Sequence, residues 1–331
     1  MIVSAEQALL IFKKLPAEMQ SFYFHPQYVI NDALYKKDIQ AVFFVQEKNE
    51  NIYYHAFHLG KVPNTPYFDI QSPYGYGGPL CVGDELFKNE CIENYKKWCI
   101  DQSVLIEFIR FHPLMKNEMN YYGQIFENRQ TVYIDLTKEN LLYEFSTRVR
   151  TAIKKAQNSN VTITFSKSKY YIQQFIDMYI ALMNKKNALE DYFFNEEYFI
   201  HLLQNEAVFL ANAENELGQV IGASLFFANG HIAEYHLSAS IEEGRKKNVA
   251  NLLLYEFAEL VKKQDVQLLY LGGGTDRTNE NPLLFFKRGF SKNEATFKIG
   301  KYEHNHVVYN EMKSEYLKKE PHKEHFILYY R

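Results

Sequence analysis

The residues Leu271-Gly-Gly-Gly-Thr-Asp-Arg-Thr-Asn-Glu-Asn-Pro-Leu-Leu-Phe-Phe-Lys-Arg-Gly-Phe290 decide the fold of this chain. An apolar run ends at three glycines, which accept positive φ angles and let another group approach the backbone closely. After a polar loop, Asn281 and Pro282 predict the N-cap and first position of a short helix that carries Lys287. The same pattern also occurs in an ordinary strand-to-helix turn with a solvated lysine. The rest of the sequence must therefore decide between such a turn and a functional site.

Length and composition describe a globular protein of two domains. The chain has 331 residues, a formal net charge of −3, and 26 Tyr and 26 Phe against one Trp. Two domains are expected at this length. A slightly acidic chain argues against an extended nucleic-acid-binding surface, and against DNA as a partner, but leaves room for local basic patches.

Targeting signals and metal motifs are absent from the sequence pattern. Cys81, Cys91 and Cys99 form no CxxC pair and have no zinc spacing, so we expect a reducing compartment and no metal. The first residues lack the basic and apolar regions of a signal peptide, and no run is long enough to cross a bilayer. We therefore expect a cytoplasmic protein that contacts a membrane surface transiently at most.

The first part of the chain alternates helices and strands. Ser4 and Gln7 predict a capping box at the first helix, and two β-rich runs, 41–46 and 52–58, predict a hairpin. A loop rich in glycine and proline, 69–80, carries Tyr74 and Tyr76. It is either a structured loop that points these tyrosines into a cleft or a plain surface loop. A helix over 84–100 and a strand over 103–111 follow.

Glu107 stands alone among the apolar residues of the strand over 103–111. A buried carboxylate must be protonated or paired, and Arg110 is the candidate partner. Exposure of Glu107 to solvent is the interpretation that the pattern favours.

A basic helix follows the strand over 131–136. Helical periodicity runs from Lys138 to about Gln157, and its second half carries Arg148, Arg150, Lys154 and Lys155 without an acid. This pattern is typical of a solvated basic face. It also fits an anion site for a phosphate-bearing ligand.

The second part of the chain predicts an antiparallel meander followed by a helix, a strand and a helix. Strands over 207–213, 219–228 and 231–237 lead into a helix that extends to about Lys263. The first turn of this helix carries Arg245-Lys-Lys-Asn248-Val-Ala250. A basic loop between a strand and a helix N-terminus is suited to binding pyrophosphate on backbone N–H groups.

Taken together, these elements resemble the tandem acyltransferases of the FemABX group, in which two GNAT-like lobes pack side by side. The resemblance covers nearly the whole chain. The segments that carry it are Ser72-Pro-Tyr-Gly-Tyr-Gly-Gly-Pro-Leu80, Arg110-Phe-His-Pro-Leu114, Thr131-Val-Tyr-Ile-Asp-Leu136, Arg148-Val-Arg-Thr-Ala-Ile-Lys-Lys-Ala156, Tyr235-His-Leu237, Leu271-Gly-Gly-Gly274 and Phe285-Phe-Lys-Arg-Gly-Phe290.

The resemblance implies an α+β protein of two GNAT-like lobes, each with a mixed, mostly antiparallel sheet flanked by helices. We expect the first lobe over residues 1–130, completed by 301–331, and the second over 131–300, with the acyl-transfer site. The implied reaction transfers an acyl group to an amine, without metal, in the biogenesis of a cell-envelope peptidoglycan or polysaccharide. The acceptor is a nucleotide-linked or lipid-linked amino sugar or muropeptide.

Donor choice remains open between acyl-CoA, which we favour slightly, and aminoacyl-tRNA. Enzymes of the GNAT class that use CoA carry Gln/Arg-x-x-Gly-x-Gly/Ala at the pyrophosphate loop. Here Arg245 and Ala250 match this pattern, while Asn248 stands where the first glycine belongs. Asn tolerates left-handed backbone conformations, so a working loop is compatible with this departure. A third alternative is a non-catalytic protein that binds an envelope precursor.

Three sets of residues form the expected site. Lys287 is our first choice for stabilising negative charge in the transition state, because the family's Phe-Lys pair matches Phe286-Lys287. The other catalytic candidates, including those for the base that deprotonates the amine, are Glu234, Tyr235, Tyr255 and Asp276. The expected donor-binding residues are Arg245, Lys246, Lys247, Asn248, Val249 and Ala250. The expected substrate-binding residues are Tyr74, Tyr76, Arg110, Arg148, Arg150, Lys154, Gly272, Gly273 and Gly274.

Overall fold

The computed structural model describes residues 1–278 and 280–331; Asn279, which belongs to the glycine-rich stretch 271–290, and the side chain of Asp191 lie outside the described residues. The chain folds as two compact units, residues 1–128 with 296–331, and residues 129–295. The sequence placed these boundaries at 130/131 and 300/301. Among the described residues, no helix is both long and apolar enough to span a membrane.

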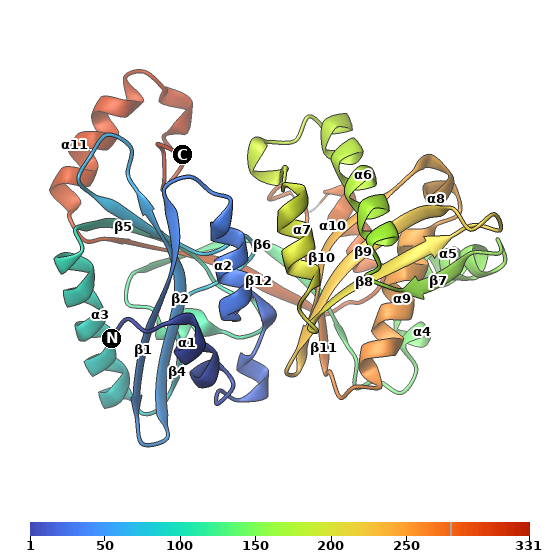
Figure 1. Ribbon diagram of the computed structural model, residues 1–331, viewed down its shortest axis with the longest axis horizontal. Coiled ribbons are helices and arrows are strands. Elements are labelled where there is room, and N and C mark those ends of the chain that lie inside the picture. The colour runs from blue at the N-terminus through green and yellow to red at the C-terminus, as the bar shows by residue number, and fades with distance from the viewer. Residues whose placement is uncertain (279) are drawn as a thin grey trace. The chain divides into compact units, whose positions relative to one another are not determined.

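The first unit contains a mixed sheet flanked by helices (Figure 1). Its strands follow the order β1-β2-β3-β5-β12, with β4 paired to β2, and only β3 and β5 pair in parallel. The strands are β1 (Ile39–Lys48), β2 (Asn51–Lys61), β3 (Phe68–Gln71), β4 (Leu80–Val82), β5 (Val104–Arg110) and β12 (Glu294–Glu303). The helices are α1 (Ala5–Phe12), α2 (Pro26–Leu34), α3 (Glu85–Asp101) and α11 (His306–Leu317).

The second unit also has a mostly antiparallel sheet, in the order β6-β11-β10-β9-β8-β7. The strands are β6 (Gln124–Asp135), β7 (Thr162–Phe165), β8 (Val208–Glu214), β9 (Val220–Asn229), β10 (Ile232–Ser240) and β11 (Leu268–Gly273). The helices are α4 (Leu141–Glu144), α5 (Thr147–Gln157), α6 (Lys169–Lys185), α7 (Glu196–Leu203), α8 (Glu242–Lys246), α9 (Val249–Lys262) and α10 (Pro282–Arg288). The protein is therefore of the α+β class, as expected.

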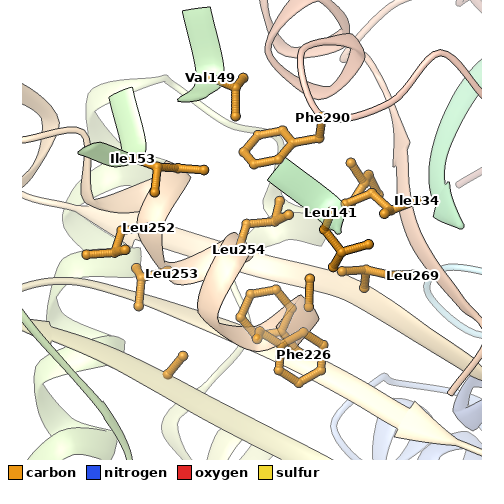
Figure 2. Close-up of a cluster of buried hydrophobic side chains, with 14 of the residues drawn as sticks. Ile134, Leu141, Val149, Ile153, Phe226, Leu252, Leu253, Leu254, Leu269 and Phe290 are labelled. Carbon is orange, nitrogen blue, oxygen red and sulfur yellow. The ribbon is translucent and has the colours of Figure 1, made fainter. Parts of the chain in front are cut away.

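One apolar core holds α5, α9 and the sheet of the second unit together (Figure 2). Val149 and Ile153 from α5 and Leu253 from α9 are at most 1% exposed. The rings of Phe226 on β9 and Phe257 on α9 stack with centroids 4.0 Å apart. Each such side chain contributes about 1.5–3 kcal/mol on burial. This core fixes the position of α9 on the sheet.

Three local features of the structure agree with the sequence predictions, namely two helix starts and one hairpin. Ser4 and Gln7 form the predicted capping box of α1. Asn281 caps α10, with Pro282 at the first helical position. The predicted hairpin is formed by β1 and β2.

Two predicted helices were wrong in length, because each is interrupted by a cap. The helix predicted over 138–157 is divided into α4 and α5, because the backbone of Phe145 and Ser146 is extended between them. The Ser146 hydroxyl then caps α5 by accepting a hydrogen bond from Val149 N at 3.4 Å. The helix predicted up to Lys263 is divided into α8 and α9 at Asn248, which has a left-handed backbone, φ 58° and ψ 36°.

The solvent exposure favoured for Glu107 was also wrong. Its side chain is completely buried and pairs with His304 instead of Arg110, with Glu107 Oε1 2.7 Å from His304 Nε2. Arg110 instead donates to the carbonyl oxygens of Ser72 and Pro73, at 2.9 and 2.5 Å. The partner of Glu107 lies 197 residues away in sequence, so no local pattern could reveal it.

Candidate active site

Strands β10 and β11 separate at one level of the second unit's sheet. They pair in parallel from Ile232 and Leu268 up to Glu234 and Tyr270. Beyond that level, in the part of the chain that the structure describes, β10 pairs with β9 and β11 with β6. Both strands have a register shift there, between Tyr235 and Leu237 and between Tyr270 and Gly272. We call this level the splay point.

The glycine run lies just beyond the splay point on β11. Gly272 has φ +79°, and a Cβ atom added there would lie 3.2 Å from Lys287 Nζ. Lys287 Nζ donates to the carbonyl oxygen of Gly273 at 2.7 Å. At Gly274 an added Cβ would lie 2.6 Å from the side chain of Asn281. The glycines therefore permit the close approach predicted from sequence, and the groups that approach are Lys287 and Asn281.

Lys287 is a buried amine with a perturbed pKa. Its side chain is 7% exposed. Burial, reinforced by the positive charge of Arg129, lowers the pKa of Lys287 to about 7. Arg129 Nη1 donates to the carbonyl oxygen of Gly274 at 3.0 Å. Lys287 can therefore gain or lose a proton near neutral pH, a property associated with functional sites.

Hydrogen bonds of Asn281 fix α10 to the glycine loop. Its side chain accepts from Leu283 N and Leu284 N at 2.9 and 3.2 Å. The same side chain donates to Thr275 Oγ1 at 2.7 Å and Asp276 Oδ2 at 2.8 Å. The side-chain amide of Asn281 therefore connects the glycine loop to α10, and the position of Lys287 on α10 depends on it.

Asp276 also orders this loop. Its Oδ1 accepts from Thr278 N at 2.8 Å and Thr278 Oγ1 at 2.6 Å. The bonds to Thr278 and Asn281 lower the pKa of Asp276. A general base works best with a pKa near the operating pH, so these bonds count against Asp276 in that role.

The other catalytic candidates lie on β10, α9 and α10. Glu234 is buried at the last position of β10 that pairs with β11. Tyr235 stacks on Phe226, with centroids 5.3 Å apart, and burial raises its pKa. Tyr255 on α9 and Phe286 on α10 pack against the core of the second unit.

His236 lies inside the β10 bulge, and sequence reasoning gave it no role. Its ring lies 4.4 Å from that of Phe227, and its Nε2 lies 3.4 Å from Tyr198 Oη. A register shift does not show in a single sequence; the available signal was the Tyr235-His-Leu237 segment of the family resemblance, which includes His236.

The expected donor loop spans the turn from α8 to α9. Arg245 Nη1 donates to Ser240 O at 2.5 Å. Lys246 pairs with Glu242 at 2.7 Å and Lys247 with Glu243 at 2.9 Å. The charges of Lys246 and Lys247 are therefore neutralised by those of Glu242 and Glu243, which reduces the net positive charge of this turn.

The start of α9 leaves backbone donors for an anion. Among the described residues no side chain caps α9, and its first turn has no acidic residue. The amides of Val249 and Ala250, at the first helical positions, have no intrahelical acceptor. Asn248 adopts the left-handed conformation that a glycine would take at this position.

The basic residues of α5 do not share one partner. Arg148 donates to Phe285 O at 2.9 Å, and its guanidinium lies 4.3 Å from the centre of the Phe285 ring. Arg150 donates to Phe145 O at 2.8 Å and to Thr147 Oγ1 at 3.0 Å. Lys154 is exposed. Arg150 therefore stabilises the junction of α4 and α5, and a phosphate would compete with these contacts.

Tyr74, Tyr76 and Arg110 belong to the first unit. Asp32 Oδ2 accepts from Tyr74 N at 2.7 Å. The ring of Tyr76 lies 5.0–5.5 Å from those of Tyr23, His112 and Phe297. Together with the Arg110 bonds to Ser72 and Pro73, these contacts show that the loop over 69–80 is structured. That it points its tyrosines into a cleft stays a prediction.

Comparisons with known proteins define the class. Residues 144–288 match the model of the acetyltransferase (GNAT) domain, and this segment includes the splay point, the glycine run and Lys287. The second unit therefore contains a GNAT-type acetyltransferase domain, and this match supports an acyltransferase. No curated protein matches the chain.

Solved structures share the fold over nearly the whole chain. FemX is 13% identical, covers 95% of this chain and 99% of its own, and has a TM-score of 0.73. L-PGS from Bacillus licheniformis is 14% identical, with 94% and 95% coverage and a TM-score of 0.60. The C-terminal domain of a putative lysylphosphatidylglycerol synthetase from Agrobacterium fabrum is 13% identical, with 95% and 96% coverage and a TM-score of 0.60. The expected likeness to tandem GNAT acyltransferases is confirmed at the level of the fold.

Proposed function

We propose that this protein is an N-acyltransferase that moves an acyl group, with acetyl as the first candidate, from acyl-CoA to the amine of a cell-envelope precursor. The observation that supports this proposal most directly is the buried amine of Lys287, bound to Gly273 O next to the level where β10 and β11 separate. Separated strands expose backbone groups to an entering acyl group, and a fixed charge there acts where water is excluded.

Lys287 would stabilise the oxygen that becomes negative when the amine attacks the acyl carbonyl. A pre-positioned ammonium does not need to reorganise during the reaction, and one such donor is worth about 2.7–4 kcal/mol in comparable sites. The bond to Gly273 O keeps Nζ in place before substrate enters. In this reaction acyl-CoA would supply an activated thioester carbonyl.

The turn between α8 and α9 is the proposed binding site for the diphosphate of the donor. Its favourable features are the two amides at the start of α9, the missing acid in the first turn and the left-handed Asn248. The helix dipole adds to these donors.

Aminoacyl-tRNA is a second candidate donor, which one observation favours. The amides of Arg245, Lys247 and Asn248 already donate to Ile241 O, Glu243 O and Arg245 O. Because these amides are already bonded, fewer backbone N–H groups remain to bind the diphosphate of CoA, and this favours a donor other than CoA. The acceptor in this case would be a UDP-linked or lipid-linked muropeptide.

A donor comparison tests the proposal. Purified protein would be incubated with labelled acetyl-CoA or with charged tRNA, in each case with amino-sugar nucleotides and lipid-linked acceptors. A lipid acceptor is included because one similar structure is the C-terminal domain of a putative lysylphosphatidylglycerol synthetase. We expect label from acetyl-CoA on an acceptor amine. Transfer from charged tRNA alone would select the second donor, and transfer from neither would contradict the function.

A further inference from the structure

In the first unit, three chemically different side chains converge on a buried carboxylate. Glu107 lies on β5, Cys99 on α3, and His304 directly after β12. The side chains of Glu107 and His304 are 0% and 3% exposed. Glu107 Oε1 lies 2.7 Å from His304 Nε2 and 4.0 Å from Cys99 Sγ. One donor atom from each residue lies within 4.8 Å of those of the other two.

The carboxylate is only half satisfied. Tyr122 donates its hydroxyl to Glu107 Oε1, and the same hydroxyl lies 3.4 Å from His304 Nε2. Glu107 Oε2 is buried without a hydrogen bond of normal geometry among the described residues, although the Tyr121 hydroxyl lies close enough to this carboxyl group to raise the pKa of Tyr121 further than burial alone. An unsatisfied buried polar atom costs about 1–3 kcal/mol, and more when the group is charged. Such an atom indicates a bound water or ion.

The donor set identifies the ion. Sulfur, imidazole nitrogen and carboxylate oxygen together are typical ligands of Zn²⁺, which binds them at about 2.0–2.3 Å. Tetrahedral bonds of that length separate the ligand atoms by roughly 3.3–3.8 Å. Glu107 Oε1 lies 2.7 Å from His304 Nε2, which is a hydrogen-bond distance shorter than this separation, and 4.0 Å from Cys99 Sγ, which is slightly longer. Binding of an ion would therefore require small rotations of these side chains. We propose that Cys99, Glu107 and His304 bind one Zn²⁺ ion, with the Tyr122 hydroxyl or a water in the fourth position.

A cavity lies beside this site, although its lining includes none of the three proposed ligands. Its volume is about 390 Å³, and its lining includes Tyr122, Tyr302 and His306. Tyr122 therefore belongs both to the cavity wall and to the proposed zinc site. Coordination replaces the thiol proton of Cys99, which passes to the buffer.

The proposed ion would connect the C-terminal part of the chain to α3 and β5. Zinc ligands in local motifs lie a few residues apart, but these lie at positions 99, 107 and 304. The sequence therefore could not reveal the site. The site lies within the first unit and does not depend on the proposed acyl transfer.

Metal binding by the purified full-length chain tests the proposal. After treatment with a chelator and desalting, the protein would be titrated with Zn²⁺ and, separately, with Co²⁺. We expect one tightly bound Zn²⁺ per chain and a thiolate-to-cobalt charge-transfer absorption in the near ultraviolet. Cys99→Ser should remove that absorption and weaken Zn²⁺ binding by at least about 100-fold.

Cys91→Ser is the matched control, because Cys91 is also buried on α3 but is not part of the cluster. This variant should bind both metals like the wild type. If Cys99→Ser fails to fold, the wild-type titration decides. Absence of stoichiometric Zn²⁺ and of the charge-transfer absorption in the wild type would overturn the proposal, and a water would then be the occupant. A cobalt spectrum that Cys99→Ser leaves unchanged would also overturn it.

Discussion

Lys287 Nζ lies 2.7 Å from Gly273 O, and a Cβ atom added to Gly272 would lie 3.2 Å from the same Nζ. The Lys287 amine on α10 therefore packs closely against the glycines of β11, and the absence of side chains on these glycines allows this contact. A side chain at Gly272 would strain the backbone and force Lys287 Nζ to shift by a few tenths of an ångström, and a solvated lysine at 287 would lose the bond to Gly273 O. This relationship separates the proposed site from an ordinary strand-to-helix turn.

Stability should depend on pH through Lys287. Burial lowers its pKa from 10.5 to about 7, so the unfolded state binds the proton more tightly. The cost of burying the ammonium is fully present below pH 7 and disappears as pH rises from 7 towards 10.5. Over about 3.5 units this corresponds to at most about 5 kcal/mol.

We therefore expect Lys287→Met to be more stable than the wild type at pH 6.5, with the difference shrinking by pH 10. Urea unfolding at the two pH values measures it. Lys292→Met, which removes an exposed lysine, should show no such trend. A difference for Lys287→Met that is the same at both pH values would be inconsistent with a lowered pKa.

Activity should fall above neutral pH if Lys287 acts as an ammonium. The basic limb of kcat/KM reports the pKa of this group in the free enzyme, which we expect near 7. Arg129→Gln removes a nearby positive charge and should move this limb to higher pH. Pre-steady-state or steady-state pH profiles of the two proteins measure the shift. A limb that stays in place would show that Arg129 does not act through Lys287.

Gly272→Ala should impair activity beyond its effect on stability. Its positive φ of +79° costs about 1–2 kcal/mol for a residue with a Cβ atom, and that atom would displace Lys287. We expect turnover to drop at least about 10-fold, the effect of about 1.4 kcal/mol on the barrier.

Gly218→Ala is the control for backbone strain. Gly218 has φ +72°, and nothing lies within 4 Å of an added Cβ atom. Chemical unfolding should show a similar loss of stability in both variants, and a turnover assay should show a loss in Gly272→Ala alone. Equal activity in the two would argue against the contact with Lys287.

Asn248→Gly tests the choice of donor. The backbone of Asn248 is already left-handed, so glycine fits without rearrangement and restores the residue typical of CoA-binding loops. We expect a lower KM for acetyl-CoA with kcat little changed. Asn49→Gly, at a similar φ of 58° in the first unit, should leave KM unchanged. If the donor is aminoacyl-tRNA, the two variants should behave alike.

The sequence correctly predicted structural features that are formed by residues close together in the chain. The Ser4–Gln7 box, the β1–β2 hairpin and the Asn281–Pro282 helix start were confirmed because each is formed within a few residues. Ser146 interrupts a helix whose apolar periodicity continues across the break, so periodicity alone overestimated its length.

Features that depend on distant residues were not predictable. Glu107 meets His304 only after the C-terminal segment returns to the first unit. The bulges of β10 and β11 lie where the pairing between these two strands ends, and no residue type marks them. The lowered pKa of Lys287 comes first from its burial in the folded chain and second from Arg129, which lies 158 positions earlier (287 − 129).

The most direct test of the central claim is the turnover of Lys287→Met compared with Lys292→Met, measured with the donor and acceptor that the wild type uses. Circular dichroism and unfolding would first establish that both variants are folded. We predict that Lys287→Met lowers kcat by about 100- to 1,000-fold, as expected for loss of one charged donor at a developing oxyanion. Lys292→Met should match the wild type. Near-normal turnover of a folded Lys287→Met protein would contradict the assignment of Lys287 to the acyl-transfer site.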